Sequence, residues 1–177
     1  MIGDRNVDVF IASSTGSLTV AKRIAKYVND AADHADKQNR ISVTVWDSYF
    51  DKSGGKYCWE TILQATNEFD YAIILLGTDD DAEIRGQKYK IARDNVLIEA
   101  GAFMAKLPSQ HVRCFFAKDV KIPSDFSGIN HTLFSFSKSK LTQGDTDCLN
   151  QLFTECKTYH SEKEILAREK LSEAEAT

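Results

Sequence analysis

A chain of 177 residues, 42% hydrophobic and 27% charged, has the size and composition of one globular domain with a hydrophobic core. Its net charge of −4 argues against direct binding to nucleic acid or to an acidic membrane surface. No apolar run approaches the roughly 20 residues that a membrane-spanning helix needs. The four cysteines form no C-x-x-C pair and no signal-peptide pattern precedes them, so we expect reduced thiols and a cytoplasmic protein.

The N-terminal third has the pattern of an α/β unit. A short β-branched and aromatic run, Val7 to Ala12, predicts a buried strand. A loop of small polar residues, Ser13 to Ser17, follows it. Apolar residues at helical spacing then predict a helix from about Leu18 to Asp33.

The middle of the chain repeats this alternation. We expect a second strand over 42–46, a loop over 47–56 that contains Ser53-Gly54-Gly55, and a helix from about Trp59 to Asn67. The run Tyr71 to Gly77 is apolar throughout, which is typical of a strand buried on both faces of a parallel sheet.

The remaining elements complete an α/β domain. We expect a polar loop over 82–92, a helix after Arg93, strands over 112–117 and 132–137, and an amphipathic helix near 149–159. The alternation predicts a flavodoxin-like, doubly wound, mostly parallel sheet of five strands with a C-terminal helix. We assign residues 1–160 to this domain and the charged, helix-prone residues 161–177 to a tail or linker.

The helix after Arg93 contains one carboxylate, Glu99, among apolar side chains. Asp94 and Asn95 are residue types that cap helix N-termini. A charge in a buried helix is costly unless its surroundings compensate it. Glu99 therefore points either to a narrow solvent-facing stripe or into a cleft where it performs chemistry.

Ligands of doubly wound sheets bind beyond the carboxyl ends of the strands, near the switch in strand order. This rule brings together Ser13, Ser14, the loop from Asp47, the Thr78-Asp79 pair and the start of the Glu99 helix. Trp46, at the end of a strand, either stacks on a ligand ring or packs at the rim of the core.

Several site types lack their motifs. The chain contains neither G-x-G-x-x-G nor G-x-x-x-x-G-K-[ST], and no G-x-S-x-G elbow. Cys58 has no histidine placed to activate it, which favours a packing role. Asp79 to Asp81 favour a solvated turn over a metal site, and the scattered histidines make a metal centre unexpected.

Four segments of the chain resemble one known family. They are Val9 to Ser14, Trp46-Asp47 with the Gly-containing loop, Ile73 to Leu76 with the following acidic residues, and Arg85-Gly86 with the RDNV-x-x-E-x-G-x-F run from Arg93 to Phe103. The last is the most specific. The chain resembles, over roughly residues 7–136, bacterial TIR-like domains of anti-phage defence effectors, including those fused to bacterial STING and those of Pycsar effectors.

The resemblance implies a catalytic role for Glu99 in cleaving NAD+, which would be a substrate and not a cofactor. It further implies a toxic effector that self-associates for activity, with a cyclic nucleotide sensed by a domain outside these residues. We expect Ser13, Ser14, Trp46, Asp47, Thr78, Asp79, Arg93 and Asn95 around the substrate. Arg93 either holds a phosphate, orients Glu99 or anchors a loop. Two alternatives stay open: a non-enzymatic TIR interaction module, and a related enzyme that cleaves N-glycosidic bonds of nucleosides.

Overall fold

The computed structural model describes residues 7–34, 41–52, 59–129 and 131–175. Its centre is a five-stranded sheet in the order β2-β1-β3-β6-β7, in which every neighbouring pair is parallel. This arrangement confirms the predicted doubly wound sheet. The strands are β1 (Val7–Ser13), β2 (Ile41–Val45), β3 (Tyr71–Leu76), β6 (Val112–Ala117) and β7 (His131–Phe134).

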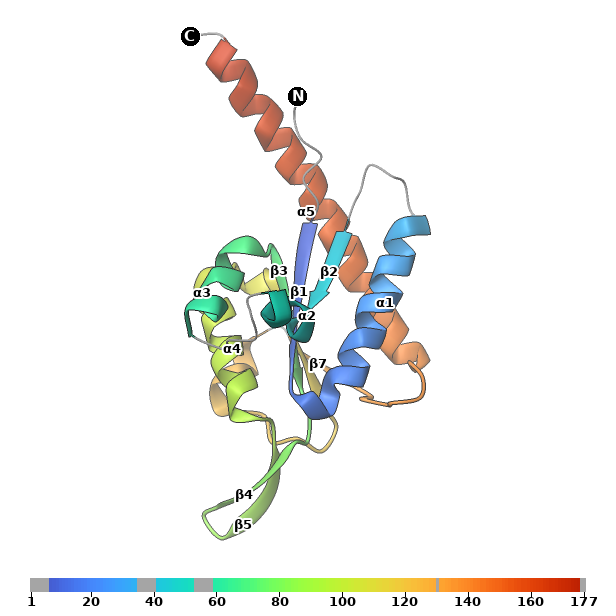
Figure 1. The fold of residues 1–177 in the computed structure, drawn as a ribbon, viewed down its shortest axis with the longest axis vertical. Helices are drawn as coiled ribbons and strands as arrows, with labels where there is room; N and C mark the ends of the chain where they lie inside the picture. The colour runs from blue at the N-terminus through green and yellow to red at the C-terminus, as the bar shows by residue number, and fades with distance from the viewer. Residues whose placement is uncertain (1–6, 35–40, 53–58, 130, 176–177) are drawn as a thin grey trace.

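Helices cover both faces of the sheet (Figure 1). One face carries α1 (Leu18–His34) and α5 (Gln143–Glu175); the other carries α2 (Trp46–Lys52), α3 (Trp59–Glu68) and α4 (Asp94–Lys106). Side chains of a strand alternate between the two faces, so β1 and β3 feed both cores. Ile11 and Ile73 belong to the core beneath α1 and α5, and Phe10 and Ile74 to the opposite core.

The switch in strand order lies between β1 and β3. The two strands pair directly, with Ser13 opposite Leu75 at their carboxyl ends. The chain leaves β1 toward α1 on one face, whereas the next helix after β3 is α4, on the other face. Side chains cannot fill the space above two strands whose connections diverge, so a crevice opens there.

The prediction of a loop over 47–56 is wrong for the first half of that range. Residues Trp46 to Lys52 form the helix α2, and residues 53–56 lie outside the described part of the chain. The helix forms because Trp46 and Phe50, one turn apart, pack their rings at a centroid distance of 6.3 Å, and Phe50 is buried. The Gly-containing stretch that indicated a loop begins only after this turn.

The loop predicted over 82–92 is also wrong. This segment forms a hairpin of β4 (Asp80–Ile84) and β5 (Gln87–Ile91), which projects from the body of the domain (Figure 1). Its two turn residues, Arg85 and Gly86, have φ values of 53° and 78°, the positive pair that a type I′ turn requires. The alternation that favours a strand was present but weak, because charged residues occupy most of the exposed positions.

The last strand is shorter than the predicted range 132–137. β7 ends at Phe134, and two residues later Phe136 has a φ of 50°, in the left-handed region where a strand cannot continue. The final helix is longer than predicted, because α5 runs unbroken from Gln143 to Glu175. The division between a domain and a tail near residue 160 stays a prediction. No helix in the described ranges is long and apolar enough to span a bilayer.

Candidate functional site

A cavity of about 220 Å³ opens at the carboxyl ends of β1 and β2, against the first turns of α4. Small-ligand sites are concave and occur at such switch points. The cavity brings together six of the residues expected around a substrate, and adds Thr15, Gly16 and Val96. Those six are Ser13, Ser14, Trp46, Arg93, Asn95 and Glu99.

Glu99 faces this cavity from the second turn of α4. The residue is only 4% exposed, so it does not lie on a solvent-facing stripe. That stripe is occupied instead by Ile98, which is 53% exposed, and by Gly101. Val96, Ala100 and Phe103 pack the same helix onto the sheet and fix the direction in which Glu99 points. A carboxylate held in this way is preorganised and shielded from bulk water, which strengthens its interaction with a nearby positive charge.

The start of α4 differs from the capping predicted. Arg93 is the N-cap residue and makes no side-chain cap hydrogen bond, while Asp94 lies in the first turn and accepts from the Asn95 N–H at 2.8 Å. Asp94 is therefore a first-turn carboxylate that complements the helix dipole. Asn95, exposed at the helix start, is left to line the cavity.

Trp46 forms one wall of the cavity and is held by a specific hydrogen bond. Its indole N–H donates to the Ser13 hydroxyl oxygen at 2.9 Å, and Ser13 is buried. The ring also packs against both core clusters. The indole thus has a fixed orientation. It packs at the rim of the core and also lines the cavity, so both positions that the sequence left open apply to it.

Ser14 and Asp79 connect the ends of β1 and β3. The Ser14 hydroxyl donates to Oδ1 of Asp79 and accepts from the Ser17 N–H at 3.2 Å. Asp79 in turn donates its own N–H to the Ile91 carbonyl at 3.1 Å, which joins this pair to the base of the hairpin. Oδ2 of Asp79 is buried and has no hydrogen-bond partner among the described residues.

Arg93 anchors the segment after β3, which is one of the three roles that the sequence left open for it. Its Nε lies 2.9 Å from Oδ2 of Asp80, so the pair closes the base of the β4–β5 hairpin beside the cavity. Both side chains are partly exposed, and such pairs contribute about 0–1 kcal/mol to folding. Arg93 nevertheless lines the cavity and adds a positively charged residue to its wall.

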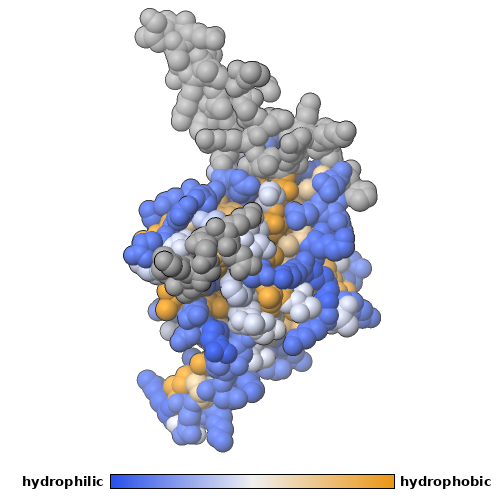
Figure 2. All heavy atoms as spheres, in the orientation of Figure 1, coloured by the Kyte–Doolittle hydropathy of each residue, from blue (hydrophilic) through white to orange (hydrophobic). Residues whose placement is uncertain are grey.

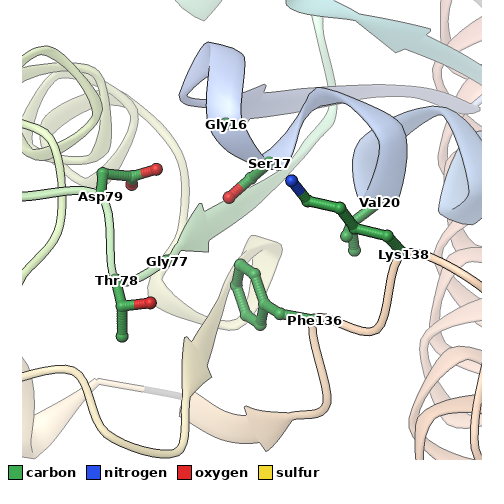
Figure 3. A pocket seen from close by; sticks show the side chains of 8 residues that line it. All are labelled: Gly16, Ser17, Val20, Gly77, Thr78, Asp79, Phe136 and Lys138. Carbon is green, nitrogen blue, oxygen red and sulfur yellow. The ribbon is translucent and has the colours of Figure 1, made fainter.

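The other predicted site residues lie outside the Glu99 cavity. Asp47 forms an ion pair with Lys22 at 2.6 Å. Thr78 and Asp79 line a second cavity, of about 290 Å³, together with Gly16 and Ser17 (Figure 3). Sequence reasoning missed Phe136 and Lys138, which line that second cavity from the segment after β7. No spacing in the sequence marks them, because a turn brings them there.

Neither metal nor thiol chemistry finds support in the described ranges. No group of three or more potential metal ligands occurs among those residues. Burial raises the pKa of the Cys114 and Cys156 thiols to about 12, which makes them poor nucleophiles. Cys58 lies outside the described residues.

Comparisons with known proteins agree on one family. The family model described as the TIR domain of CAP12/Pycsar effector proteins matches residues 8–135. A CD-NTase-associated protein 12 of Lachnospiraceae bacterium (strain RUG226) is 29% identical over 142 residues, covering 80% of this chain and 42% of that protein. The corresponding protein of Niabella drilacis is 28% identical, covering 82% of this chain and 45% of that protein.

A third relative has a different printed name. The Pycsar effector protein PaPycTIR of Pseudomonas aeruginosa is 26% identical over 152 residues, covering 82% of this chain and 46% of that protein. The chain thus spans less than half the length of each of these three relatives.

Proposed function

Because the chain belongs to the TIR domains of the CAP12/Pycsar effector family, we propose that it cleaves NAD+ to nicotinamide and ADP-ribose, with Glu99 as the catalytic residue. The observation that supports this proposal best is the placement of Glu99. A 4% exposed carboxylate faces a cavity at the carboxyl ends of β1 and β2, among hydroxyls and an indole. Titratable groups that are buried in a cleft in this way occur often at functional sites, and a carboxylate there is placed to stabilise positive charge on a substrate.

One carboxylate is enough for this reaction. Most glycosidases need a second carboxyl group because an oxygen leaving group must be protonated. The nicotinamide of NAD+ is already cationic. When the N-glycosidic bond breaks, its electron pair moves to the ring nitrogen and nicotinamide departs neutral. Positive charge then develops on the ribose, where the Glu99 carboxylate stabilises it. Water adds to the anomeric carbon and releases one proton to the solvent, which completes ADP-ribose.

The neighbours of Glu99 have roles that follow from their chemistry. The Trp46 ring offers a flat surface for the nicotinamide ring, which as a cation is attracted to an aromatic face. Ser14 and Asn95 carry polar groups that can bind ribose hydroxyls. Arg93 supplies a positive charge for the phosphate that is attached to that ribose.

The biological role follows from the relatives' names. They are CD-NTase-associated and Pycsar effector proteins, so we infer that this chain is the toxic part of an anti-phage effector that acts in the cytoplasm. A cyclic nucleotide is then the activating signal, and we expect a segment outside these residues to sense it. Self-association would bring TIR domains together and switch on NAD+ cleavage.

The decisive experiment is incubation with NAD+ and detection of free nicotinamide by chromatography, with native protein and Glu99→Gln side by side. The substitution is nearly isosteric and removes only the charge, so we expect a folded protein whose turnover falls by about three orders of magnitude, as when electrostatic stabilisation of a transition state is lost. Glu162→Gln, at an exposed position of α5 that lines neither cavity at the sheet edge, is the matched control and keeps native activity.

Two results would contradict the proposal. Near-native turnover by folded Glu99→Gln would remove the catalytic assignment. Absence of cleavage by native protein even at high concentration would favour a non-enzymatic TIR module. Base exchange on deoxynucleosides, tested in parallel, would instead indicate the nucleoside enzyme.

A further inference from the structure

The second cavity lies beside the first, because Ser14 lines the first cavity, Asp79 lines the second, and their side chains are hydrogen-bonded. Gly16 lines both cavities. The volume of the second cavity, about 290 Å³, compares with about 220 Å³ for the Glu99 cavity. Two adjoining cavities at one switch point suit a ligand with two halves.

Polar groups without partners point into this second cavity. The Ser17 hydroxyl makes no hydrogen bond to any part of the chain that the structure describes, although the residue is only 5% exposed. The Thr78 hydroxyl likewise has no partner there. Figure 3 shows the Lys138 ammonium extending toward Ser17, across from Thr78 and Asp79. Lys138 forms no ion pair with a described residue. The Asp79 carboxylate lines the same cavity, and its buried Oδ2 without a described partner suits a ribose hydroxyl, which can donate to it. The Lys138 ammonium and the hydroxyls of Ser17 and Thr78 are the donors that suit a phosphate.

An aromatic ring completes the lining. The Phe136 ring lies beside Gly77, so close that a β-carbon on Gly77 would stand 3.4 Å from it. Phe136 has a φ of 50°, a conformation that costs a bulky residue free energy. The packing of its ring against Phe134, with centroids 6.1 Å apart at 87°, helps to hold it there.

The segment that carries these two residues is anchored. The Arg23 guanidinium, from α1, donates to the carbonyl oxygens of Ser137 and Lys138. Phe136 and Lys138 are therefore presented to the cavity by a turn that is tied to the helix beneath it. A flat apolar surface next to a cation is the combination that binds a base and its phosphate together.

From this arrangement we propose that the second cavity binds the phosphate-bearing adenosine half of the dinucleotide whose nicotinamide ribose lies at Glu99. Lys138 binds the phosphate, Phe136 stacks on the adenine, and the hydroxyls of Ser17 and Thr78 donate to the phosphate or ribose oxygens. This inference rests on the proposed NAD+ cleavage. It assigns the specificity for a dinucleotide, as opposed to a mononucleotide, to residues of this chain outside the Glu99 cavity.

The test compares Lys138→Ala with Lys140→Ala. Lys140 is an exposed lysine of the same segment that does not line the cavity, which makes it the matched control. We expect Lys138→Ala to raise KM for NAD+ about tenfold with kcat changed by less than about twofold, since a charge-assisted contact made equally in the ground and transition states is lost. Lys140→Ala should match the native protein in both constants.

A second arm measures binding without turnover. Calorimetric titration of the Glu99→Gln protein with ADP, with nicotinamide mononucleotide and with inorganic phosphate separates the two cavities. Adding Lys138→Ala or Ser17→Ala should weaken ADP binding about tenfold and leave nicotinamide mononucleotide binding unchanged. Ser17→Ala breaks no hydrogen bond to the described protein, so its thermal unfolding should stay native and a loss of ADP affinity would report the ligand contact alone.

The two proposals fail in different ways. If Lys138→Ala cleaves NAD+ with native KM, the adenosine subsite is overturned while NAD+ cleavage stands. If the native protein does not cleave NAD+ but its ADP binding depends on Lys138, the adenosine subsite stands and the proposed activity fails. A third result is that ADP binding depends on Lys138 while the KM for NAD+ is unchanged in Lys138→Ala. The cavity would then bind a nucleotide other than the substrate, which overturns the dinucleotide assignment.

Discussion

The Ser14 hydroxyl donates a hydrogen bond to the Asp79 carboxylate across the carboxyl ends of β1 and β3. Ser14 follows β1 and Asp79 immediately precedes β4, so this bond fixes the loop after the first strand to the base of the hairpin. It also joins a residue of the Glu99 cavity to a residue of the neighbouring one.

This pair should be energetically coupled. Ser14→Ala removes the donor to a largely buried carboxylate, and we expect it to lower the free energy of unfolding by about 1–3 kcal/mol. Urea unfolding of Ser14→Ala, Asp79→Ala and the double variant forms a double-mutant cycle, in which we expect a coupling of about 1 kcal/mol or more. Ser48→Ala, at an exposed serine of α2, serves as the control. Effects that add within about 0.5 kcal/mol would show that the contact contributes nothing specific.

Gly77 and Gly101 should respond to alanine in opposite directions. A β-carbon on Gly77 would stand 2.7 Å from the Ser17 hydroxyl and 3.3 Å from Oδ2 of Asp79, which is a clash in a packed site. A β-carbon on Gly101 meets nothing within 4 Å, on the exposed side of α4. We expect Gly77→Ala to destabilise by about 1–3 kcal/mol and Gly101→Ala to stabilise by about 0.5–1 kcal/mol. The same sign for both in chemical denaturation would contradict this packing.

Acid should weaken the start of α5 through Asp145. Burial raises the pKa of this carboxyl, but hydrogen bonds from Ser135 and Thr142 outweigh it and leave the pKa below its usual range. A lowered folded-state pKa means that the carboxylate stabilises the fold above the unfolded pKa of about 3.9, and that this contribution is lost as the pH falls through the folded value.

Asp145→Asn should therefore destabilise at neutral pH by about 1–3 kcal/mol, and its deficit should shrink below about pH 4. Asp147→Asn, at an exposed position two residues on, should show neither effect. Denaturation midpoints measured between about pH 2.5 and pH 7 provide the comparison. A deficit for Asp145→Asn that is constant over this range would exclude the charge as its cause.

Sequence reasoning predicted the strands and the crevice because both depend on local patterns and one topological rule. The mostly apolar run of β1 and the unbroken apolar run of β3 favour a parallel sheet, and the switch rule then brings Ser13, Ser14 and the Glu99 helix together. The hairpin was missed because each of its strands has little apolar alternation of its own. Ala82 and Tyr89 become neighbours only when the two strands pair. Phe136 and Lys138 were missed for a different reason, since a left-handed residue and an anchor from α1 place them.

Self-association is expected to control the activity. The hairpin projects from the domain with few contacts to the rest, and Figure 2 shows hydrophobic side chains among hydrophilic ones on it; Ile84 at its turn is 38% exposed. In the part of the chain that the structure describes, the Glu99 cavity opens to solvent where the exposed residues Arg93 and Asn95 line it. A neighbouring domain that covers this opening would exclude water and order the surrounding residues, at an entropic cost that must be met by concentration.

We therefore expect the rate of NAD+ cleavage per molecule to rise steeply with protein concentration and with crowding. Mixing gives the sharper measurement. We expect Glu99→Gln protein to be inactive itself but still able to cover the site of a native neighbour. An excess of it added to dilute native protein should therefore raise the turnover of the native molecules. Glu99→Gln carrying Ile84→Lys tests whether the hairpin makes the contact, and we expect it to stimulate less. Turnover per native molecule that is flat with concentration and indifferent to added Glu99→Gln, with light scattering showing monomers throughout, would mean that a single chain forms the complete site.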